Sequence, residues 1–117
     1  MAFDYEILTE ITTVDGSSAS ALYTNAASKK GFLRLMIIHN ANTTIETVKL
    51  YNVPDSSGSA GTAAVTNKIF EEDLVPNETY QWELKEPGII MEDTNDTLQG
   101  VTSTSSKVTF QAFGGIE

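Results

Sequence analysis

The chain has 117 residues, the length of one domain, with no cysteine, 7 Lys and Arg residues and 16 Asp and Glu residues. The absence of cysteine excludes disulfides, thiolate zinc sites and cysteine nucleophiles. The formal net charge of −9 and the scattered cations argue against nucleic-acid binding, because a phosphate backbone is bound by clustered Lys and Arg.

Short segments with apolar positions, several of them alternating with polar ones, follow one another along the chain. This period-2 pattern is typical of half-buried β-strands. In chain order the predicted strands are residues 3–8, 21–24, 32–39, 45–53, 68–74, 79–84, 89–91, 98–102 and 107–113. Clusters of Gly, Ser, Asn and Asp separate them, and a spacing of about 8–12 residues is typical of antiparallel sandwiches and barrels.

Two segments depart from simple alternation. Residues 32–39 have apolar side chains on both parities, which indicates a central strand that is covered on both faces or lies across a tight sandwich. The loop at 54–61 has the composition of the most flexible loop in the chain. The Ala-rich stretch 59–64 is interrupted by Gly61 and is too short for a helix.

From these strands and their spacing we predict an all-β protein, a single antiparallel β-sandwich of about eight strands over residues 1–117. Jelly-roll and immunoglobulin-like topologies both stay open.

The residues offer little for catalysis. His39 is the only histidine, it ends a predicted strand, and nothing singles out a serine and an acid to complete a hydrolase triad. Carboxylate pairs for glycoside hydrolysis could come from residues 71–73 or 92–96, but a sandwich with short loops has little material for the cleft that they need. We predict a protein that is not an enzyme, with no catalytic residue and no cofactor.

Asp, Asn and Thr concentrate in residues 92–97, the best calcium candidate in the chain. The segment lacks the spacing of an EF-hand loop, and the same residue types also form ordinary turns. Three Asn-X-Thr triplets, at Asn42, Asn77 and Asn95, are likewise interpreted as turns, because no export route is recognisable. We predict no bound metal.

The aromatic residues divide into two groups. Those within predicted strands fit a core: Phe32, Tyr80, Trp82 and Phe110. Phe3, Tyr5 and Phe113 lie near the chain ends, and we consider them candidates for anchoring a neighbouring subunit, since aromatic side chains are enriched at interfaces. The alternative is that these three close the ends of the sandwich.

Short motifs stand in order along nearly the whole chain. They are Leu22-Tyr23-Thr24, the strand from Leu33 to Asn40 with its polar turn, Pro76-Asn77-Glu78-Thr79, and the ending Phe110-Gln111-Ala112-Phe113-Gly114. In this order they resemble a widespread family of small bacteriophage virion proteins. The resemblance implies a structural protein on the exterior of the particle.

The most concrete form of that implication is a head decoration, or cement, protein. Such a protein is a homo-oligomer that binds the major capsid protein or other virion proteins across the seams between capsomers. The alternative to a head decoration protein is a tail, baseplate or fibre component of the virion. The second alternative is a carbohydrate-binding β-sandwich. The expected location is the virion, assembled in a bacterial cytoplasm. We expect no membrane partner, because no apolar run approaches the ~20 residues that span a bilayer. Residues 1–10 carry acids without a base, which is not the pattern of a signal peptide.

Overall fold

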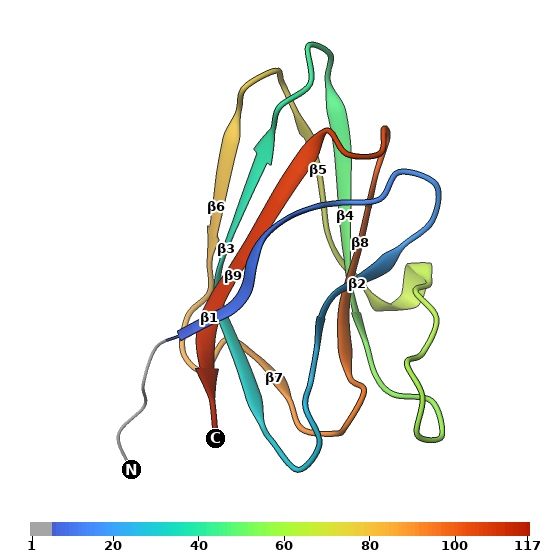
Figure 1. Ribbon diagram of the computed structural model, residues 1–117, viewed down its shortest axis with the longest axis vertical. Helices are drawn as coiled ribbons and strands as arrows, with labels where there is room; N and C mark the ends of the chain where they lie inside the picture. The colour runs from blue at the N-terminus through green and yellow to red at the C-terminus, as the bar shows by residue number, and fades with distance from the viewer. Residues whose placement is uncertain (1–5) are drawn as a thin grey trace.

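Nine β-strands form two antiparallel sheets that pack face to face in the computed structural model, which describes residues 6–117 (Figure 1). They are β1 (Glu6–Thr13), β2 (Ser20–Thr24), β3 (Gly31–Asn40), β4 (Glu46–Val53), β5 (Lys68–Leu74), β6 (Thr79–Glu83), β7 (Ile89–Met91), β8 (Thr97–Thr102) and β9 (Val108–Ile116). A single 3-10 turn, η1 (Val65–Asn67), precedes β5. No helix within the described residues is long and apolar enough to cross a membrane. The predicted all-β sandwich is confirmed.

The strand order is that of a jelly roll. One sheet has the order β1-β9-β3-β6, with β7 paired to the first residues of β3, and the other has the order β2-β8-β4-β5. Consecutive strands therefore cross from one sheet to the other except at β4–β5 and β6–β7. An immunoglobulin-like sandwich keeps its first two strands in one sheet, whereas β1 and β2 lie in different sheets here. Of the two topologies that the sequence left open, the jelly roll is the one observed.

Each predicted strand has a counterpart, and the largest differences are at the two ends of the chain. β1 continues to Thr13, where it still pairs with Thr109, and β9 continues to Ile116, which pairs with Gly31. β9 is long because it has a neighbour on each side, β1 and β3, along most of its length. Residues 3–5 of the first predicted strand lie outside the described residues.

β3 explains why residues 32–39 are apolar on both parities. A bulge between Leu33 and Leu35 shifts its register against β9, so that the inward positions are Leu33, Met36 and Ile38, each fully buried. The outward positions Leu35 and Ile37 are only half-buried. The structure thus favours a strand in a two-layer sandwich over one covered on both faces, and it leaves apolar side chains on the outer surface.

The core lies between the sheets and is closed at both sides. Its fully buried side chains include Val14, Leu33, Met36, Ile38, Val48, Leu50, Leu98, Val108 and Phe110. On one side Phe70 of β5 packs against Tyr80 and Trp82 of β6, with ring centroids 5.2 and 5.0 Å apart. On the other side the Thr9 hydroxyl of β1 donates to the Leu22 carbonyl of β2 at 2.8 Å.

Buried polar groups fix the loop between β3 and β4. The Asn40 amide donates to the carbonyls of Thr44 and Leu74, at 3.0 and 2.9 Å. Glu46, only 1% exposed, accepts one hydrogen bond from the Asn42 amide and one from the Thr104 backbone N–H, both at 2.8 Å. Burial of a carboxylate is tolerated when its oxygens are hydrogen-bonded in this way.

Candidate functional site

The outer surface of the five-stranded sheet carries a row of apolar side chains. Directly paired residues of antiparallel strands share a face of the sheet, and the register places Ile7 of β1 beside Phe113 of β9, and Phe113 beside Leu35 of β3. Ile37 follows on the same face of β3, because it lies two residues after Leu35. Ile7 is 57% exposed and the other three are half-buried. We call Ile7, Leu35, Ile37 and Phe113 the apolar face.

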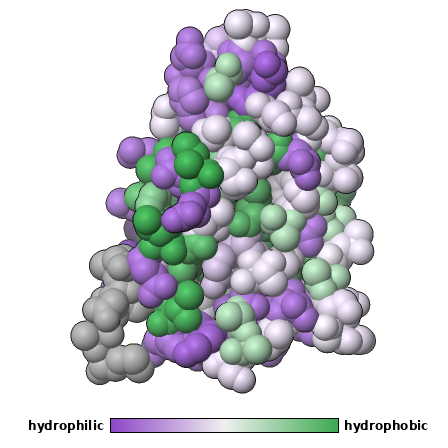
Figure 2. All heavy atoms as spheres, viewed as in Figure 1, coloured by the Kyte–Doolittle hydropathy of each residue, from purple (hydrophilic) through white to green (hydrophobic). Residues whose placement is uncertain are grey.

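Figure 2 shows apolar atoms gathered in a column over the side of the molecule where β1, β9, β3 and β6 lie. Apart from Ile11 of β1, which is 65% exposed, the next rows of the sheet are more polar. Ile37 is paired with Gln111 and Gln81, and His39 with Thr109 and Thr79. The apolar face therefore occupies one end of the sheet rather than its whole surface.

One hollow lies at the apolar face, and a second shares Arg34 with it. The first has a volume of about 210 Å³ and is lined by Arg34, Leu35, Glu83 and Phe113. The second, of about 360 Å³, is lined by Phe32, Arg34, Glu86, Pro87 and Glu117. The Arg34 guanidinium lies 3.4 Å from the Glu86 carboxylate. The first hollow is smaller than a typical small-molecule pocket of roughly 300–1,000 Å³, so it has the size for a single side chain.

The opposite sheet presents a different surface. On β8, Gln99 is only 6% exposed, because its amide donates to the Gly61 carbonyl of the loop that follows β4. Farther along, Lys49 is paired with Glu71 and the Thr47 hydroxyl donates to Asp73 at 2.6 Å. A loop thus covers one part of this sheet and polar pairs occupy another.

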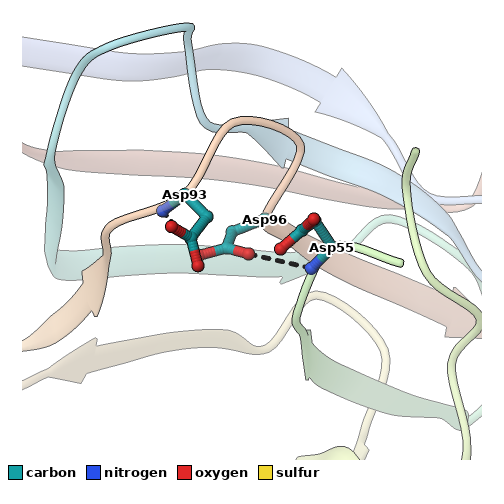
Figure 3. Close-up of side chains that lie close together, drawn as sticks. All are labelled: Asp55, Asp93 and Asp96. Carbon is teal, nitrogen blue, oxygen red and sulfur yellow. Dashed lines mark hydrogen bonds between the residues drawn. The ribbon is translucent and has the colours of Figure 1, made fainter. Parts of the chain in front are cut away.

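Three aspartates come together where the loop after β4 meets the turn between β7 and β8 (Figure 3). Ligand atoms of Asp55, Asp93 and Asp96 lie within 4.8 Å of one another, and this is the one such group of potential metal ligands within residues 6–117. The sequence pointed to residues 92–97 but not to Asp55, and Glu92 is not part of the group.

Hydrogen bonds give Asp96 a structural role in this cluster. Its Oδ1 accepts the Asp55 backbone N–H at 2.8 Å, and its Oδ2 accepts the Asp93 backbone N–H at 3.1 Å. Asn25, 1% exposed, joins the same turn to the end of β2 through its backbone N–H to the Asp96 carbonyl and its amide to the Asp93 carbonyl. Asp96 therefore orders two loops, which accounts for a carboxylate at this position without a cation.

Phe113 lies on the apolar face, while Phe3 and Tyr5 are outside the described residues. His39 is near the end of β3, where its Nδ1 is 2.8 Å from the Thr79 hydroxyl. Trp82 is half-buried and packs against Phe70.

The asparagines of the Asn-X-Thr triplets lie in turns or bends, as predicted, and the threonines of two triplets begin β6 and β8. Asn77 and Asn95 have φ values of 65° and 72°, a left-handed conformation that Asn adopts more readily than most residues. Asn42 donates its side-chain amide to Glu46. Backbone geometry thus explains Asn77 and Asn95, and a side-chain hydrogen bond explains Asn42.

The apolar face itself was not predicted, apart from Phe113. Residues 32–39 carry apolar side chains on both faces of the strand, which could have indicated an apolar outer surface. We took this pattern only as a sign that the strand is buried. Ile7 gave no such signal, because an isoleucine in an alternating strand is equally expected in a core.

Comparison of the sequence with protein-family models and with curated proteins, and of the fold with solved structures, gives no significant match.

Proposed function

We propose that the protein is a non-catalytic structural component that packs against other proteins, in the form of a bacteriophage head decoration protein. The observation that carries the packing role is the apolar face, since Ile7, Leu35, Ile37 and Phe113 meet on one outer surface of the sandwich. Contiguous exposed apolar surface with a polar surround is typical of protein interaction sites.

The bacteriophage part of the proposal is supported by the ordered motifs described above. The jelly-roll fold adds little to it, because that fold occurs in viral capsid proteins but also in lectins and cupins. An acidic surface with net charge −9 suits a protein that stays dissolved before assembly and joins a preformed particle in many copies.

A tail, baseplate or fibre component is the second candidate, since the same motifs support it equally. The carbohydrate-binding alternative is weaker. A sugar platform needs an exposed aromatic ring, whereas Trp82 and Tyr80 both pack against Phe70 at the side of the core.

The test is to locate the protein on particles. Particles from lysed cells that express the gene are banded on a density gradient, their tails are removed, and the heads are analysed by mass spectrometry. Retention by tailless heads is the expected result. Loss with the tails would favour the second candidate, and absence from all particles would overturn both. Specific retention of the isolated protein on a glycan array would favour carbohydrate binding.

A further inference from the structure

We infer that the apolar face and its first hollow dock a partner protein segment in which an apolar side chain is flanked by lysine or arginine. The inference deepens the proposed function and rests on it in one respect, since both take the protein to act by binding another protein. What it adds is the location of the contact and the chemistry of the partner.

The location follows from shape and composition. The first hollow has Leu35 and Phe113 in its lining, and Ile7 extends the same row across β1. A hollow of about 210 Å³ accommodates one apolar side chain of the partner. Ile7 would then be covered by the rest of the segment, which removes apolar surface from water and stabilises the complex.

The charge of the partner follows from the groups around the hollows. The two linings contain three carboxylates, those of Glu83, Glu86 and Glu117, and one guanidinium, that of Arg34. The Arg34 guanidinium lies 3.4 Å from the Glu86 carboxylate, so the remaining charge of the two linings, from Glu83 and Glu117, is negative. On β1, the exposed Glu6 precedes Ile7 and adds another acid beside the same row. Lysine or arginine next to the docking side chain would complement this field.

A second copy of the chain fits this surface less well. Two such faces would bring like-charged rims together, and each chain carries a net charge of −9. Like charges brought together across an interface are unfavourable and lower the association rate. The charge distribution thus favours a cationic partner over self-association through this face.

The experiment titrates the isotope-labelled full chain with three synthetic eight-residue peptides and follows backbone amide NMR shifts. The first alternates lysine and leucine, the second glutamate and leucine, and the third lysine and serine. We expect the lysine–leucine peptide to shift amides around Ile7, Leu35, Glu83 and Phe113, with the other two peptides binding at least about tenfold more weakly, which corresponds to 1.4 kcal/mol.

Matched variants separate this site from general attraction between a cationic peptide and an acidic protein. Ile7→Ser is compared with Ile45→Ser, because both isoleucines are 57% exposed and Ile45 precedes β4 in the other sheet. Glu83→Lys is compared with Glu72→Lys on β5. Ile7→Ser and Glu83→Lys should each weaken binding about five- to tenfold, and the two control variants should leave it unchanged.

Three results would each overturn the inference: the site and control variants have equal effects, the shifts spread over all acidic surfaces, or the glutamate–leucine peptide binds as tightly as the lysine–leucine peptide. So would concentration-dependent shifts of the same amides without peptide, which would identify a second copy as the occupant. Particle binding provides the separate readout. If the protein stays on heads while the peptide results are negative, the proposed function stands and the docking site is wrong. If the peptide results are positive while particles lack the protein, the docking site stands and the proposed function is wrong.

Discussion

Asp96 is the residue whose removal should most clearly expose how the loops are held. Replacing Asp96 with Ala deletes the acceptors of two backbone N–H groups, at 2.8 Å for Asp55 and 3.1 Å for Asp93. A hydrogen bond to a charged group is worth about 1.5–3 kcal/mol. We use the lower value because this site is partly open to solvent, which gives a loss of about 3 kcal/mol from the two bonds.

The same substitution also removes a charge from the three-aspartate cluster, which acts in the opposite direction. At 4.8 Å, the upper limit of the separations in this cluster, the repulsion between two carboxylates in water is about 0.9 kcal/mol before salt screening. Asp93→Ala is the matched control, because it relieves the same kind of repulsion but leaves both N–H bonds to Asp96 in place. The free energy of unfolding of the two variants should therefore differ by about 3 kcal/mol, with Asp96→Ala the less stable.

Urea unfolding followed by tryptophan fluorescence measures this difference in a buffer with EDTA. For a chain of this length, 3 kcal/mol corresponds to roughly 10 °C in Tm, so thermal unfolding is a second measure. Equal stability of the two variants would refute the assigned role of Asp96. In the wild-type protein, excess calcium should leave Tm unchanged. A rise that disappears in Asp93→Ala would instead identify the cluster as a cation site.

Three further outcomes follow from the packing and charges. Glu46→Ala should cost about 3 kcal/mol, because it leaves the Thr104 N–H without its buried acceptor; a urea midpoint near wild type would contradict this. Gly114→Ala should be at least as destabilising, about 3 kcal/mol or more, because its Cβ would lie 1.7 Å from the Phe32 carbonyl oxygen; an unchanged Tm would contradict it. The hydrogen bond from Lys68 lowers the pKa of the Glu71 carboxyl below its ordinary value. The pair of Lys68 and Glu71 therefore stabilises the fold at pH values above the ordinary pKa of a glutamate, and this stabilisation is lost as the pH falls through the lowered pKa of Glu71. Lys68→Met should raise the pKa of Glu71 in an NMR titration.

The fold class could be predicted because its signals are local. Alternation within a strand and turn residues such as Asn77 and Asn95 depend on neighbours along the chain, and both positions adopt the left-handed conformation that Asn tolerates. The topology depends instead on contacts between distant segments. β1 pairs with β9 at the other end of the chain, and no local pattern of Ile7 or Phe113 specifies that pairing.

The same distinction explains what was missed at the candidate sites. The apolar face exists only because β1, β9 and β3 bring Ile7, Phe113 and Leu35 into one row. Likewise, Asp55 joins Asp96 across 41 positions of sequence. Phe113 was identified from its residue type and its nearness to the chain end, and its apolar neighbours became visible only with the strand order.

The pairing of β1 with β9 also determines how the molecule would respond to mechanical load. Glu6 lies beside Gly114 and Thr13 beside Thr109, so the start of β1 and the end of β9 are at the same end of the ladder. Force that separates these ends pulls along the hydrogen bonds, which run perpendicular to antiparallel strands, and opens them one pair at a time. Under force applied between the start of β1 and the end of β9, we therefore expect the β1–β9 ladder to open progressively from Glu6 and Gly114.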